Sequence, residues 1–119
     1  MKAYKLVRKA KDGQLYPLFI DKVRPYVIGE HRVAEYHPTK GFAPRYGFHA
    51  CFTPWAPHLK TKLASGQKRV WIECEVDDYT TYDRPESQCG SWILANQLTV
   101  LRELTFEEAD TIRECKGVA

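Results

Sequence analysis

An alternation of apolar and charged residues at positions 69–76 constrains the fold of this 119-residue chain more than any other feature. Successive side chains of a β-strand point to opposite faces, so this spacing predicts a strand. The face expected in a hydrophobic core carries Val70, Ile72, Cys74 and Val76. The opposite face carries Trp71, Glu73 and Glu75 and is expected to be wet. We therefore interpret its carboxylates as solvated charges and not as an acid–base pair.

The N-terminal segment predicts a β-hairpin. Residues 3–9 alternate, and Asp12-Gly13 is a dipeptide typical of tight hairpin turns. Leu15–Ile20 would be the returning strand, which Pro17 restricts to a sheet edge or a bulge.

The C-terminal part predicts a long strand followed by a helix. Residues 92–104 have the composition of a strand, with a bulge expected near Asn96-Gln97. Thr105 followed by Glu108 forms a capping-box pattern, which predicts a helix that reaches about Glu114. The expected fold class is α+β: a single domain with a twisted antiparallel sheet of about five or six strands and a C-terminal helix.

Charge is distributed unevenly along the chain. Residues 1–70 hold 14 Lys and Arg against 4 Asp and Glu, a balance of +10, whereas residues 71–119 hold 4 against 11, a balance of −7. The two halves could neutralise each other across the fold, or a basic face could meet an anionic partner. The N-terminal hairpin is the expected basic face, with side chains for phosphate contacts and rings for base stacking: Lys2, Tyr4, Lys5, Arg8, Lys9 and Lys11.

Cysteine usage and hydropathy favour a cytoplasmic protein. No apolar run suits a signal peptide or approaches the roughly 20 residues that span a bilayer. None of the four cysteines forms a Cys-x-x-Cys pair, so we expect reduced thiols, no metal and no cofactor. A zinc site built from His49, Cys51 and Cys89 is the alternative.

Two segments carry the candidate site residues. The run from His37 to His58 combines rigid Pro and Gly positions with histidines and aromatic rings, and a second polar loop precedes the strand at Trp92. We expect these loops to meet and to form a binding site from Tyr46, His49, Trp55, Glu86, Gln88 and Ser91. The alternative is a rigid loop with aromatic packing and a solvated loop beside it.

The segment Gly47-Phe48-His49-Ala50-Cys51, followed by Pro54, resembles small uncharacterised proteins of bacteria and their phages. The order of elements is also similar, at the level of layout, to that of ADP-ribosyltransferases, which use NAD. That similarity implies catalytic roles for Arg8, for His49 or Tyr46, and for Glu86.

Two hypotheses for function follow. The first is a small accessory binding module of phage or mobile-element type, which engages a host protein or nucleic acid. The second is a small NAD-using enzyme of ADP-ribosyltransferase-like layout. No phosphate-binding loop, dinucleotide fingerprint, zinc helix or nucleophile elbow occurs in the sequence, which favours the first.

Overall fold

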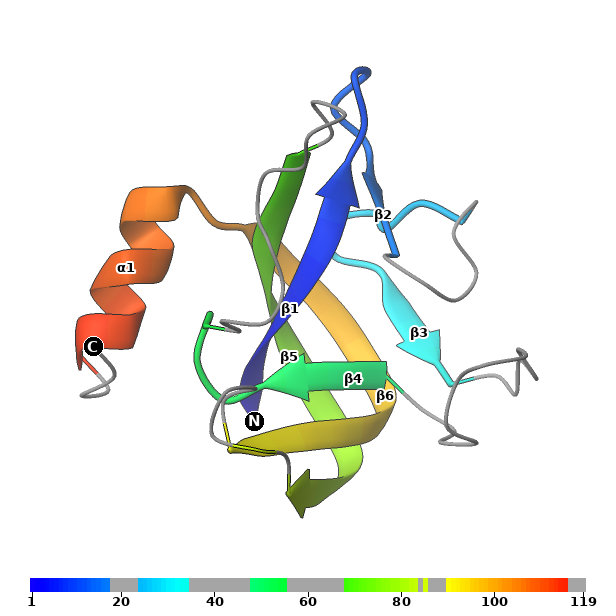
Figure 1. Cartoon of the computed structure of the whole chain (residues 1–119). Coiled ribbons are helices and arrows are strands. Elements are labelled where there is room, and N and C mark those ends of the chain that lie inside the picture. The colour runs from blue at the N-terminus through cyan, green and yellow to red at the C-terminus, as the bar shows by residue number, and fades with distance from the viewer. Residues whose placement is uncertain (18–23, 35–47, 56–67, 84, 86–89, 116–119) are drawn as a thin grey trace.

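The computed structural model describes residues 1–17, 24–34, 48–55, 68–83, 85 and 90–115. These residues form one antiparallel sheet of six strands and a C-terminal helix, which confirms the predicted α+β class. The elements are β1 (Lys2–Lys9), β2 (Leu15–Tyr16), β3 (His31–Val33), β4 (Phe48–Cys51), β5 (Lys68–Asp83), β6 (Ser91–Glu103) and α1 (Phe106–Cys115) (Figure 1). In this part of the chain, no helix is long and apolar enough to cross a membrane.

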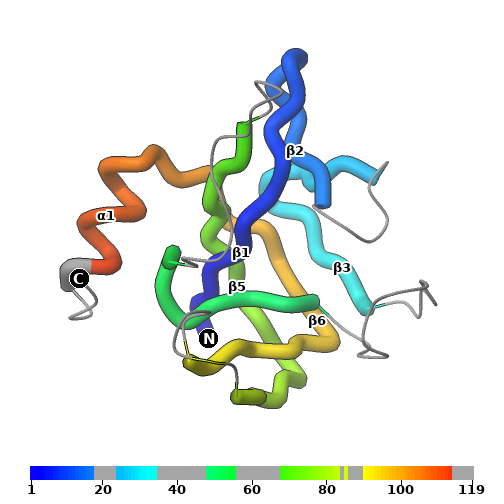
Figure 2. The backbone as a smooth tube through the Cα atoms, in the orientation of Figure 1, coloured from blue at the N-terminus to red at the C-terminus, as the bar shows by residue number. Residues whose placement is uncertain are grey.

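The strand pairings close on themselves. β5 pairs with both β1 and β6, while β4 pairs with both β6 and β1, so these four strands form a closed circuit. β2 extends the sheet beside β1, and β3 extends it beside β6. Figure 2 shows β5 and β6 as one long bent hairpin, with β4 along the first half of β6. The circuit gives the sheet an enclosed inner face and an outer face.

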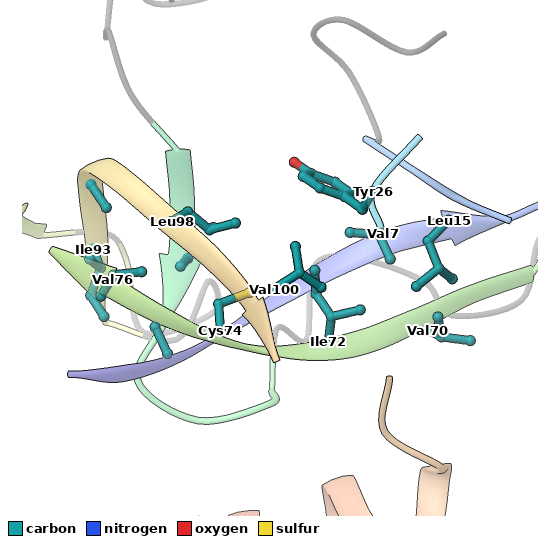
Figure 3. Close-up of a cluster of buried hydrophobic side chains, with 13 residues drawn as sticks. Val7, Leu15, Tyr26, Val70, Ile72, Cys74, Val76, Ile93, Leu98 and Val100 are labelled. Atoms are coloured by element: carbon teal, nitrogen blue, oxygen red, sulfur yellow. The ribbon is translucent and has the colours of Figure 1, made fainter. Parts of the chain in front are cut away.

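The inner face holds the larger of two hydrophobic clusters, which we call the inner core. The prediction for the strand at 69–76 is confirmed, because its four apolar alternate residues all lie in this cluster. Figure 3 shows these four side chains on β5, among the other members of the inner core. The members are Ala3, Val7, Leu15, Tyr26, Ala50, Val70, Ile72, Cys74, Val76, Ile93, Ala95, Leu98 and Val100.

A second cluster, the outer core, covers part of the outer face and includes residues of α1. Its buried members are Tyr4, Leu6, Cys51, Trp71, Trp92, Leu104 and Ala109. The expectation that the face of β5 with Trp71 and Glu73 is wet is therefore wrong for these two residues, which are 6% exposed each. Side chains of the neighbouring strands and of helix α1, which is distant in the sequence, together cover this part of the face.

The Asp12-Gly13 turn is confirmed. Gly13 adopts φ 86°, a left-handed conformation that glycine enters without a steric penalty. The turn is closed by a hydrogen bond from Ala10 N to Gln14 O at 2.9 Å, and Asp12 Oδ1 accepts a bond from Gln14 N at 2.9 Å. The returning strand spans Leu15–Tyr16 and ends before Pro17, and residues 18–20 of the expected strand lie outside the described residues. It lies at the sheet edge, as Pro17 predicts.

The predicted bulge lies elsewhere. The register between β5 and β6 shifts between Glu73 and Cys74, which face Arg102 and Val100, and not near Asn96-Gln97. Asn96 instead lies opposite a local distortion of β5, at which Asp78 adopts φ 49°. The side chain of Asp78 accepts a hydrogen bond from Asn96 Nδ2 at 3.0 Å.

The predicted capping box starts α1. Glu108 N donates to Thr105 Oγ1 at 3.1 Å, and Thr105 N donates to Glu108 Oε1 at 3.0 Å. The bond from the Thr105 backbone, followed by bonds from Arg102 and from the Thr105 hydroxyl, lowers the pKa of Glu108. Because the folded pKa is lowered, the ionised carboxylate of Glu108 contributes to the stability of the fold. This stabilisation is fully present above the ordinary glutamate pKa and is lost as the pH falls through the folded pKa.

Thr105→Ala is expected to lower the free energy of unfolding by about 1 kcal/mol, because it leaves a helix N-terminal N–H without its capping oxygen. Urea denaturation would measure the change. Thr111→Ala is the matched control in the same helix, since Thr111 bonds only the carbonyl of Glu107 one turn earlier at 2.9 Å and is exposed. Equal losses in the two variants would contradict a capping role for Thr105.

Candidate functional site

His49, the central residue of the predicted site, lies in β4 and contacts β5. Its Nδ1 lies 2.7 Å from the hydroxyl of Tyr82, and the two rings meet edge to face at 5.8 Å and 85°. His49 is half-buried and shares the outer face with Cys51, two residues further along the strand. Tyr82 is thus a contact partner of His49, and the sequence pattern did not identify it as a site residue.

The backbone of His49 is bonded to a lysine of β1. Lys5 lies on the inner face between Ala3 and Val7, and its Nζ donates to the His49 carbonyl at 2.9 Å. Burial lowers the pKa of Lys5. The prediction of an exposed Lys5 is wrong, because closure of the sheet turns this face of β1 inward.

The other described residues of the predicted site are Trp55 and Ser91, and both are half-buried. Trp55 N donates to Thr53 O at 2.8 Å, so Pro54 lies at the centre of a three-residue turn. Ser91 begins β6. Tyr46, Glu86 and Gln88 lie outside the described residues.

The expected meeting of the two loops required β4 and β6 to run parallel, and they are antiparallel. Phe48 faces Ala95, and Cys51 faces Trp92. The segments that precede the two strands therefore leave from opposite ends. The residues that follow β4, including Trp55, start from the end at which β6 begins.

Arg8 is far from His49 along the sheet. Arg8 faces Arg69 at the start of β5, whereas His49 contacts Tyr82 near the end of that 16-residue strand. In Figure 1 β4 lies beside the start of β1, and the arrowhead end of β1 points away from it toward the hairpin. The structure does not bring together these two residues of the NAD-enzyme layout, and Glu86 is outside the described part.

The end of the β1–β5 ladder next to the hairpin carries like charges in direct opposition. Arg8 faces Arg69, and Lys9 faces Lys68. Like charges directly opposite each other destabilise a sheet, so the fold alone gives no reason for this arrangement. With Lys11 in the hairpin turn, these residues form what we call the basic end: Arg8, Lys9, Lys11, Lys68 and Arg69.

The two faces of the basic end differ in their neighbours. On the outer face a row crosses three strands from Tyr16 through Arg8 to Arg69, and the Arg8 guanidinium lies 4.7 Å from the centre of the Tyr16 ring. On the inner face the corresponding row crosses the strands from Leu15 through Lys9 to Lys68. The Nζ atom of Lys9 pairs with the carboxylate of Glu103 at 2.9 Å. A tyrosine ring beside one guanidinium group, with a second arginine on the next strand, suits a ligand with both phosphates and bases.

The opposite end of the same ladder is neutralised. The N-terminal ammonium group lies 2.5 Å from Glu75, and Lys2 Nζ lies 3.8 Å from Glu73. Opposite charges therefore neutralise each other at this end of the β1–β5 pair. The sequence signal that points to the basic end is the pair Lys68-Arg69 at the start of β5, but its significance depends on the register with β1.

The buried thiol of Cys74 does not suit nucleophilic chemistry. Cys51 and Cys74 are both buried, and burial raises the pKa of Cys74 to about 12. The thiolate is the reactive form, so Cys74 stays inert near neutral pH. Among the residues that the structure describes, no three His, Cys, Asp or Glu side chains are grouped to hold a metal ion, and Cys89 is not in this part.

No family model, no curated protein and no solved structure matches the chain. The geometry of the chain itself must therefore support any proposal about its function.

Proposed function

We propose that this protein is a small accessory binding module that engages nucleic acid through the basic end. The observation that carries the proposal is the opposition of Arg8 to Arg69 and of Lys9 to Lys68 across β1 and β5. The resemblance of Gly47–Cys51 to phage and bacterial proteins supports a phage or mobile-element setting in the cytoplasm.

Electrostatics favours an anionic polymer at this place. Four cations lie on neighbouring strands, about 5 Å apart from one strand to the next, and like charges at this spacing repel one another even though Glu103 pairs with Lys9. A chain of phosphates would relieve this repulsion and release its own condensed counterions. The row of Tyr16, Arg8 and Arg69 adds an aromatic ring, which favours nucleic acid over an acidic protein segment.

Replacing both arginines of the row should weaken binding to a fluorescently labelled 20-nucleotide DNA strand. For Arg8→Gln with Arg69→Gln, we expect a roughly 10- to 100-fold loss of affinity at low salt, because two charged contacts are removed. Anisotropy titrations over a range of salt should show the slope of log K against log salt become shallower by about 1.4. The stability of the variant should be unchanged or higher, because a like-charge pair is removed.

Lys2→Gln with Arg113→Gln is the matched control, since it removes the same charge away from the basic end. Lys2 and Arg113 both lie beside carboxylates, Glu73 and Asp110 respectively. An equal loss of affinity in this control would contradict a localised site. Absence of binding by the unaltered protein to any nucleic acid at low salt would overturn the proposal and leave a protein partner.

A further inference from the structure

A groove of about 500 Å³ lies next to the basic end. It runs between the hairpin turn and the turn that leads into β3, with the end of β6 beside it. The lining residues are Gly13, Gln14, Leu15, Pro25, Tyr26, Val27, Ile28, Arg102 and Glu103. Figure 3 shows Leu15 and Tyr26 at the same end of the inner core.

The second turn presents apolar side chains to solvent. Val27 is 60% exposed and Ile28 is 55% exposed, which is costly for apolar residues that serve packing alone. The turn is fixed by bonds from Glu30 N to Val27 O at 2.9 Å and from Val27 N to Glu30 Oε1 at 3.0 Å. The exposed pair is therefore held in place before any ligand arrives.

A buried arginine supports the same turn from behind. Arg32 is 4% exposed, and its guanidinium lies 4.2 Å from the centre of the Tyr26 ring. It donates to the carbonyls of Arg24 and Pro25 and pairs with Glu30 at 3.1 Å. Burial opposes ionisation of Glu30, but the bonds from Arg32 and from Val27 N outweigh it and lower its pKa. The groove wall is thus a preorganised surface.

Three lining residues connect the groove to the basic end. Glu103 accepts from Lys9 at 2.9 Å, and Leu15 lies directly opposite Lys9 in the β1–β2 pair. Gln14 Oε1 accepts from the Tyr16 hydroxyl at 3.1 Å. A ligand whose phosphate contacts Lys9 is therefore next to a recess lined in part by apolar residues.

We infer that the groove accepts an unstacked nucleobase, so that the nucleic acid recognised at the basic end is single-stranded. This inference rests on the proposed function. In a duplex, the bases are paired and stacked inside the helix and cannot enter a recess on the protein surface, whereas a single strand can turn a base outward. The volume of the groove lies within the usual range for small-ligand sites, which is about 300–1,000 Å³.

The test compares one 20-nucleotide DNA sequence as a single strand and as a duplex, in anisotropy titrations at one low salt concentration. The unaltered protein should bind the single strand roughly 10-fold or more tightly than the duplex. Val27→Ser with Ile28→Ser should remove most of this preference and leave duplex binding unchanged. Arg8→Gln with Arg69→Gln should instead weaken binding to both forms.

A single strand of abasic sites, which keeps the phosphates and lacks the bases, provides the second control. It should bind more weakly than the normal strand, and the serine variant should weaken it no further. Thermal melting would verify that the exposed serine substitutions leave the fold intact. Equal binding of single strand and duplex, or no effect of the serine variant, would overturn the inference that the groove accepts a base. The proposal that the basic end binds nucleic acid would remain. Failure to bind either form would overturn both.

Discussion

Ile72→Ala is expected to lower the free energy of unfolding by about 2–4 kcal/mol. Ile72 is 0% exposed and lies in β5, where it faces Lys5 of β1 and Glu103 of β6. Because β1, β4, β5 and β6 form a closed circuit, the backbone cannot readily move inward to fill the space that the truncation leaves. The loss therefore includes a cavity contribution in addition to the lost burial, and urea denaturation would measure it.

Ile28→Ala is the matched control for this prediction. The substitution is identical, but Ile28 is 55% exposed, so its effect on stability should stay within about 0.5 kcal/mol. The inner core in Figure 3 contains Ile72 and not Ile28. A loss as large at Ile28 as at Ile72 would mean that the enclosed face of β5 has been wrongly identified.

Features set by a few neighbouring residues could be predicted from the sequence. The Asp12-Gly13 turn and the Thr105–Glu108 capping box each depend on atoms within four residues, so composition is enough to identify them. The alternation at 69–76 likewise identified the enclosed face of β5. In each case the physical cause is local.

Features set by pairing between distant residues could not be predicted in this way. The opposition of Arg8 to Arg69 depends on the register of strands 61 positions apart, and the partnership of His49 with Tyr82 depends on how β4 lies against the β5–β6 hairpin. Alternation also indicates that the two faces of a strand differ in polarity. It does not indicate whether other parts of the protein cover both faces. Lys5 was misplaced for this reason, because only closure of the sheet makes its face an inner one.

Glu73 is the residue whose burial the alternation pattern most clearly failed to predict. Its substitution is expected to give the second large change in stability. We expect Glu73→Ala to lower the free energy of unfolding by about 2–3 kcal/mol. The carboxylate side chain is 7% exposed and accepts from the hydroxyl of Tyr4 at 3.3 Å and from Arg102 Nε at 3.4 Å. Its loss would remove an acceptor from a buried hydroxyl and an ionic partner from Arg102, which also pairs with Glu108 at the start of α1.

Glu75→Ala is the matched control, because it is the same substitution on the same face of the same strand. The side chain of Glu75 is 43% exposed and pairs with the N-terminal ammonium group, so solvent screens the pair and its loss should cost about 0–1 kcal/mol. Urea denaturation of both variants would give the comparison. The sequence pattern treats the two glutamates as equivalent, whereas the outer core separates them, since it covers Glu73 and leaves Glu75 at its margin. Equal small losses would show that the face of β5 beside α1 is open to water, and equal large losses would place Glu75 in the core as well.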